Sequence, residues 1–109
     1  MIASTEVLCA QLRKEQARDL KPGGARALWR RFRADCAAGQ IQLIPYGADT
    51  TAEAERIAGL AFAHSTPVMI RSLDLIHIAS ASIAKATILV ATDQRLRAVA
   101  SLLSLRLAP

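Results

Sequence analysis

Residues 71–97, which read RSLDLIHIASASIAKATILVATDQRLR, decide the fold. Two aspartates in this stretch stand where one structural element gives way to another. Asp74 opens an apolar helical run, and Asp93 follows the strand-like residues 88–92 and opens another helix. A carboxylate just beyond the carboxyl end of a buried strand lies where open α/β sheets bind ligands. Two such carboxylates brought together would suit Mg²⁺ or Mn²⁺, which favour oxygen ligands.

The length and composition predict one cytoplasmic domain. A chain of 109 residues can bury one modest core, so residues 1–109 are expected to form a single domain. The sequence has no apolar run of the roughly 18 residues that would span a bilayer. Its start, MIASTEVLCAQLRKE, lacks the pattern of a signal peptide. Cys9 and Cys36 show no CxxC spacing and are expected to be plain thiols.

The basic charge is concentrated near the amino end. The net charge is +5, and 8 of the 14 basic residues fall between positions 13 and 33, opposed there only by Glu15 and Asp19. Such a cluster can be a solvated helix face, or a surface that binds nucleic acid through phosphate contacts. The candidates for RNA contact are Arg13, Lys14, Arg18, Arg26 and Arg30.

The first 40 residues predict a helical hairpin. A helix over 5–20, with Ser4 or Thr5 as N-cap and Glu6 in its first turn, should end at the breaker Lys21-Pro22-Gly23-Gly24. The apolar residues that follow recur at helical spacing and predict a second helix that Gly39 terminates. They form a stripe that can be core or can stack on bases: Ala25, Leu28, Trp29, Phe32 and Cys36.

The rest of the chain predicts alternating strands and helices. Strands are expected over 41–44, 88–92 and 105–107, and helices over 73–86 and 93–103. The first two strands are apolar enough to be buried on both faces. This alternation indicates an α/β fold with a parallel sheet.

A further helix is expected before the Pro67 break. Thr50 and Glu53 form a capping box for it. It carries Ile57, Leu60, Ala61 and His64 on one side. Ser72 should cap the helix that follows.

Each acidic residue also has a purely structural explanation. Asp93 can be an N-cap, and Asp74 and Glu6 can be first-turn residues that the helix dipole favours. His77, one turn after Asp74, can be a core histidine, a metal ligand or a general base. Acting together, carboxylates that hold a metal ion would support hydrolysis of a phosphodiester, and the basic hairpin would favour nucleic acid as substrate.

The segments 71–79 (RSLDLIHIA) and 92–96 (TDQRL) resemble the PIN-domain ribonucleases, and especially the VapC-type toxins of bacterial toxin–antitoxin pairs. The ending LRLAP and the start STEVL are similar to theirs too. The resemblance implies a PIN-like three-layer fold, with a small parallel sheet flanked by helices. It also implies Glu6, Asp74 and Asp93 as catalytic ligands of Mg²⁺ or Mn²⁺, RNA as substrate, homodimerisation, and a cognate antitoxin. Arg71 matches the motif without an assigned role.

One departure from the family concerns the amino end. Family members begin with a strand that carries an aspartate and then a further helix, whereas Met1 here lies five residues before Glu6. The expectation is an N-terminally truncated PIN-like domain. The first strand would then be encoded upstream, be supplied by a partner, or be lost. If it is lost, the alternative function is a catalytically inactive protein that acts by binding RNA or an antitoxin.

Overall fold

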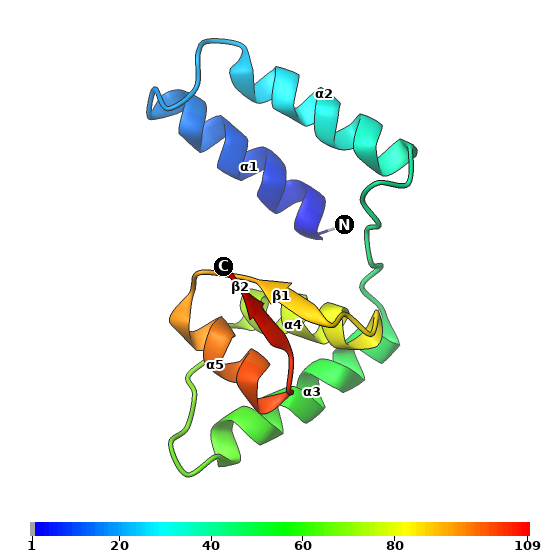
Figure 1. Cartoon of the computed structure of the whole chain (residues 1–109), viewed down its shortest axis with the longest axis vertical. Coiled ribbons are helices and arrows are strands. Elements are labelled where there is room, and N and C mark those ends of the chain that lie inside the picture. The colour runs from blue at the N-terminus through cyan, green and yellow to red at the C-terminus, as the bar shows by residue number, and fades with distance from the viewer. Residues whose placement is uncertain (1) are drawn as a thin grey trace. The chain divides into compact units, whose positions relative to one another are not determined.

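The computed structural model describes residues 2–109, and the side chains from Ala3 onward. The chain divides into two compact units, Met1–Pro45 and Tyr46–Pro109, each described below by itself. The described residues form a mixed α/β structure that is mostly helical, with five helices and one two-stranded parallel sheet (Figure 1). The prediction of a single domain stays a prediction. No helix in residues 2–109 is long and apolar enough to cross a membrane.

The first unit is a helical hairpin, in which α1 (Ile2–Gln16) lies beside α2 (Gly24–Ala37) (Figure 1). The predicted helix over 5–20 is confirmed, but its bounds are wrong. Ser4 and Thr5 lie inside α1 and are not caps. The helix ends early because Arg18 adopts a left-handed conformation with φ 64°, which a continuing α-helix cannot contain.

The second helix of the hairpin, α2, confirms the apolar spacing read from the sequence. Gly39 follows it with φ 78°, and the N–H of Gly39 donates to the carbonyl of Cys36 at 3.1 Å. Gly39 is therefore the predicted glycine terminator. Only Ala25 is fully buried among residues 3–45, so this unit has a thin core of its own.

Residues 41–44 do not form the predicted strand. Ile41, Leu43 and Ile44 are half-buried and Gln42 is exposed, in a segment without regular structure. A strand is stable only when its backbone groups pair with a neighbour. The two strands that the described residues contain pair with each other and not with this segment. Apolar composition alone is therefore not enough to make residues 41–44 a strand.

The second unit packs α3 (Ala48–Ala63), α4 (Ser72–Ile83) and α5 (Gln94–Leu102) around one core. Its sheet pairs β1 (Ile88–Val90) with β2 (Arg106–Ala108) in parallel, and Leu89 is the register partner of Leu107. α5 is the crossover that parallel strands need. Leu89 and Leu107 pack against the buried residues, which are Ile57, Ala61, Ile70, Ile78, Ala79, Val99 and Ala100.

Several predicted details of α3 and α4 are wrong. Gly47 is the N-cap of α3, and Thr50 is a fully buried residue in the first turn, where its Oγ1 accepts from the N–H of Gly47 at 3.4 Å. Of the four residues that the sequence places on one side, Ile57 and Ala61 are buried, whereas Leu60 is 44% exposed and His64 is exposed beyond the end of α3. Ser72 is the first residue of α4 and Arg71 is its N-cap.

The expectation that β1 is buried on both faces is also wrong. Leu89 is half-buried toward the core, whereas the side chains of Ile88 and Val90 are 46% and 75% exposed. Successive side chains of a strand point to opposite faces, so one face of β1 packs on the core and the other is open.

Candidate functional site

Asp93 lies at the carboxyl end of the sheet, three residues after β1 ends. It is the N-cap of α5, and its Oδ1 accepts a hydrogen bond of 3.0 Å from the N–H of Leu96. The side chain is exposed. Both readings of the sequence therefore hold for its position: Asp93 is a helix cap, and it stands at the edge where α/β folds bind ligands.

Asp74 occupies the first turn of α4, where its charge is favourable to the helix dipole. It is half-buried, as is His77 one turn later on the same helix. Arg71 is exposed at the N-cap of α4. Asp74 and Asp93 belong to the same unit and each marks a helix start in it.

Glu6 belongs to the first unit and is exposed on α1. Because α1 begins at Ile2, Glu6 follows the first turn, which contains no acidic residue. The prediction that the helix dipole favours Glu6 is therefore wrong. Its assignment as a metal ligand comes from the family resemblance alone and stays a prediction.

The donor chemistry of these residues matches Mg²⁺ or Mn²⁺, because carboxylate oxygens are the ligands that both ions favour. Residues 2–109 contain no group of three or more His, Cys, Asp or Glu side chains arranged to hold a metal ion. Asp74 and Asp93 would supply at most part of a coordination shell, which Mg²⁺ usually completes with water.

Arg97 is a residue of this edge that the sequence analysis missed. Its Nη1 donates to the carbonyl of Ala91 at 2.7 Å and to that of Pro109 at 3.4 Å. These carbonyls directly follow β1 and β2, so one guanidinium joins the carboxyl ends of both strands. No local pattern in the sequence indicates these contacts, because they depend on how α5 packs beside the two strand ends.

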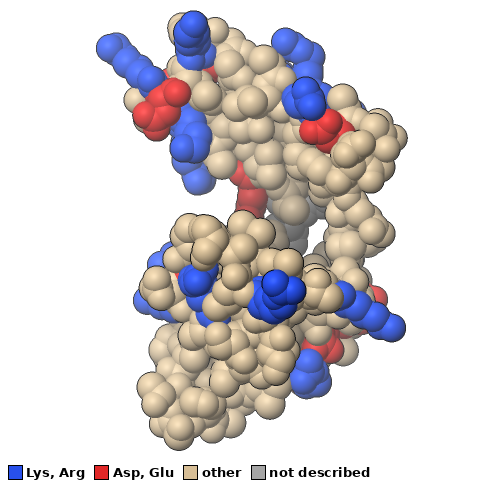
Figure 2. Space-filling view, in the orientation of Figure 1, with Lys and Arg blue, Asp and Glu red and all other residues tan. Residues whose placement is uncertain are grey.

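The basic residues proposed for RNA contact are all exposed in the first unit. Figure 2 shows Lys and Arg side chains projecting from this unit. Arg26, Arg30 and Arg33 follow one another on α2 at helical spacing and form one basic stripe. Arg31 differs, since its Nε is 3.1 Å from Oδ1 of Asp35.

The aromatic side chains of α2 lie beside this basic stripe. The rings of Trp29 and Phe32 are stacked, with centroids 5.4 Å apart and planes 21° apart. Both residues are half-buried, so they form neither a closed core nor a free platform. They border an open hollow of about 260 Å³, which is lined by Ser4, Trp29, Phe32, Arg33, Cys36 and Leu43.

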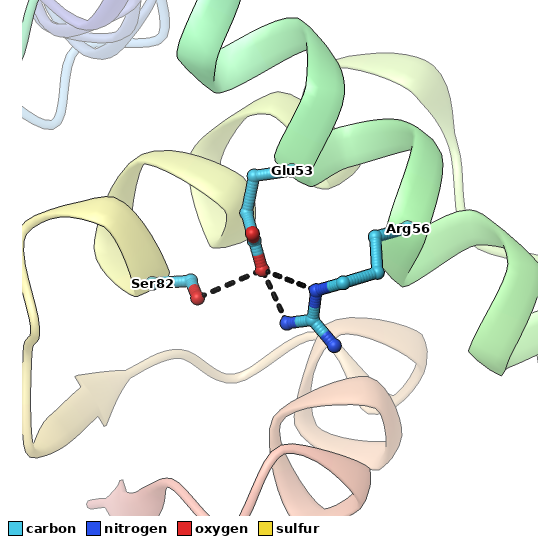
Figure 3. A network of polar contacts seen from close by, with 3 residues as sticks. All are labelled: Glu53, Arg56 and Ser82. Carbon is cyan, nitrogen blue, oxygen red and sulfur yellow. Dashed lines mark hydrogen bonds and ion pairs between the residues drawn. The ribbon is translucent and has the colours of Figure 1, made fainter.

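A polar network joins α3 to α4 in the second unit (Figure 3). Oε1 of Glu53 accepts from Nε of Arg56 at 2.9 Å, from Nη2 of Arg56, and from Oγ of Ser82 at 3.1 Å. The hydrogen bond from Arg56 is the main reason that the pKa of Glu53 is lowered; the bond from Ser82 adds to it, and burial acts in the opposite direction. Glu53 therefore links two helices and does not complete the predicted capping box.

No family model, no curated protein and no solved structure matches this chain.

Proposed function

We propose that the chain is a PIN-like, metal-dependent endoribonuclease of the VapC toxin type, which hydrolyses phosphodiester bonds of RNA at an acidic Mg²⁺ or Mn²⁺ site. The observation that carries the proposal is the position of Asp93, exposed beyond the carboxyl end of β1 and at the start of α5. This is where parallel α/β folds collect ligands. The motif resemblance of residues 71–79 and 92–96 supports the same assignment.

In this proposal the carboxylates of Asp74 and Asp93 hold the ion. A bound divalent ion would polarise a phosphoryl oxygen and lower the pKa of a bound water. Asp93 is oriented for this role because its Oδ1 is fixed to the N–H of Leu96 at 3.0 Å. Arg97, at the same edge, provides a positive charge that would attract a phosphate group.

Cleavage of RNA by the purified chain with Mn²⁺ tests the proposal. Asp93→Asn should abolish cleavage, because asparagine keeps a helix cap but loses the charge that binds the ion. Glu55→Gln, at an exposed position of α3, removes the same charge elsewhere in the unit and should leave cleavage unchanged. Cleavage that persists in Asp93→Asn would show that the site is elsewhere or that a contaminant is responsible.

A second candidate function is binding of RNA without cleavage, with the first unit as the contact surface. The exposed basic stripe of α2 favours it, since basic side chains contact phosphates. Binding of this kind should weaken steeply as salt increases. An RNA affinity that is flat between low and moderate salt contradicts this candidate.

The remaining expectations belong to the same proposal. A VapC-type toxin is neutralised by an antitoxin protein, dimerises and acts in the cytoplasm. The chain's own contribution to antitoxin binding would be its apolar surface, which in the second unit includes exposed Met69 and Leu73. Co-expression with the product of an adjacent gene, followed by co-purification, tests this part.

A further inference from the structure

The outer edge of β1 carries backbone groups that β2 does not use. The carbonyl of Thr87 accepts from the N–H of Arg106 at 3.1 Å, and the N–H of Ala91 donates to the carbonyl of Ala108 at 3.0 Å. Backbone groups alternate between the two sides of a strand. The peptide groups of Ile88 and Val90 therefore face away from β2, at an edge where the described residues supply no further strand.

The side chains at this edge are exposed and apolar. Ile88 is 46% exposed and Val90 is 75% exposed, the largest value among the exposed large apolar residues. β1 reads Ile-Leu-Val and contains none of the charges or prolines that protect edge strands from pairing. An edge of this composition favours the addition of another strand.

We propose that β1 is a dimerisation surface, on which β1 of a second copy of this chain pairs antiparallel about a two-fold axis at Leu89. In this register Ile88 lies opposite Val90 of the second copy, and Val90 lies opposite Ile88. Both residues direct N–H and C=O groups to the free edge, so the pairing forms about four hydrogen bonds. Two two-stranded sheets become one four-stranded sheet.

The β1 edges of two copies are also complementary in their side chains and in their charges. Ile88 and Val90 of the two copies face each other as β-branched cross-strand pairs, which stabilise sheets. Lys85 precedes β1 and Asp93 follows it, so the antiparallel arrangement directs each lysine toward the aspartate end of the other copy. An isologous contact of this kind closes as a dimer and does not extend into a fibre.

Sedimentation of the full chain over a range of concentrations tests the dimer. Val90→Lys places a charge on the edge without disturbing the core, because Val90 is 75% exposed, and should raise the dimer Kd by about tenfold or more. The matched control is Phe62→Lys, which changes a 47% exposed apolar residue of the same unit and should leave the Kd unchanged. Ile88→Lys should raise the dimer Kd in the same way. It serves as the test variant if circular dichroism shows that Val90→Lys is unfolded.

Cysteine cross-linking tests the register in a background that lacks the two native thiols (Cys9→Ser, Cys36→Ser). Mixed Ile88→Cys and Val90→Cys chains should form a disulfide across the interface, because opposed residues there have Cα atoms about 5.5 Å apart. Three results would overturn the proposal: a wild-type chain monomeric up to about 1 mM, a dimer that Val90→Lys and Ile88→Lys leave intact, or cross-linking no faster in the mixture than in either variant alone. The inference rests on the dimerisation that the proposed function includes, and names its surface; RNA cleavage is measured separately, so a failure of this interface and a failure of the nuclease activity are distinguishable.

Discussion

Oε1 of Glu15, near the end of α1, accepts a 3.0 Å hydrogen bond from the backbone N–H of Ala25 in the first turn of α2. The N-cap of α2 is Gly23, which has no side chain to offer this helix end. Glu15 therefore performs the capping from the neighbouring helix. This explains why a carboxylate stands among the basic residues of the hairpin.

Replacing Glu15 should loosen the hairpin. Glu15→Ala leaves the N–H of the buried Ala25 without this acceptor, and the loss should be about 1 kcal/mol of the free energy of unfolding, the usual cost of a lost cap. Trp29, the chain's single tryptophan, lies on α2, so its fluorescence during urea unfolding reports on this unit. Gln16→Ala, an exposed change on the same helix, is the control; an equal loss there would refute the capping role.

The link between α3 and α4 should depend on pH. The pKa of Glu53 is lower in the folded protein than in the unfolded chain, chiefly because Arg56 donates to it. Its contribution to stability is therefore complete above the ordinary carboxyl pKa and is lost as the pH falls through the folded pKa. The stability gap between wild type and Glu53→Gln, measured by urea unfolding at several pH values, should shrink on acidification. A gap that grows at acidic pH would contradict the assigned contacts.

Ser82→Ala isolates one bond of that network. It removes the donor 3.1 Å from Glu53 and should cost about 1 kcal/mol, as for a typical hydrogen bond. Ser101→Ala is a suitable control, because Ser101 is exposed and its hydroxyl bonds only to the carbonyl of Arg97 within its own helix. If both variants lose the same stability, the link to Glu53 contributes nothing specific.

The two roles of Asp93 can be separated by substitution. Asparagine caps a helix about as well as aspartate, so Asp93→Asn should melt close to the wild-type temperature, whereas Asp93→Ala should lose about 1 kcal/mol of stability. Both variants should lack RNA cleavage if the carboxylate binds the ion. Thermal unfolding followed by circular dichroism measures the first effect, and a destabilised Asp93→Asn would show that the negative charge itself supports α5.

The basic stripe predicts a defined salt response. Arg30→Gln should reduce the slope of log affinity against log salt by about 1, because one phosphate contact is lost. Arg95→Gln changes an exposed arginine of the second unit and should leave the slope unchanged. Titration of fluorescent RNA at several salt concentrations measures both, and equal slopes in the two variants would exclude α2 as the contact surface.

The sequence predicts the elements that local pattern controls. The apolar spacing of α2, the glycine after it, and the strand–aspartate–helix order at Asp93 are all confirmed, because each depends on neighbours along the chain. The strand over 41–44 is wrong, since a strand also needs a partner distant in sequence. Caps at Ser4, Thr50 and Ser72 are wrong for a related reason: many residues can begin a helix, and tertiary contacts select one.

The candidate site, too, is only partly predictable from the sequence. The sequence places Asp74 and Asp93 at helix starts, as the structure shows. It did not indicate that Glu53 binds Ser82, 29 residues away, or that Arg97 contacts two strand ends, because both contacts depend on packing. A family motif in the sequence indicates which residue types occur at which spacing. Which distant side chains come into contact depends on how the chain folds.

Arg97 places a fixed positive charge at the carboxyl edge of the sheet. Its guanidinium is held by the carbonyls of Ala91 and Pro109, and the first of these lies two residues before Asp93. If Asp93 holds a divalent ion as proposed, that ion would lie near the positive charge of Arg97, which would oppose metal binding in the absence of substrate. In that proposal an anionic RNA would offset this repulsion, so that metal and RNA would each raise the affinity of the protein for the other.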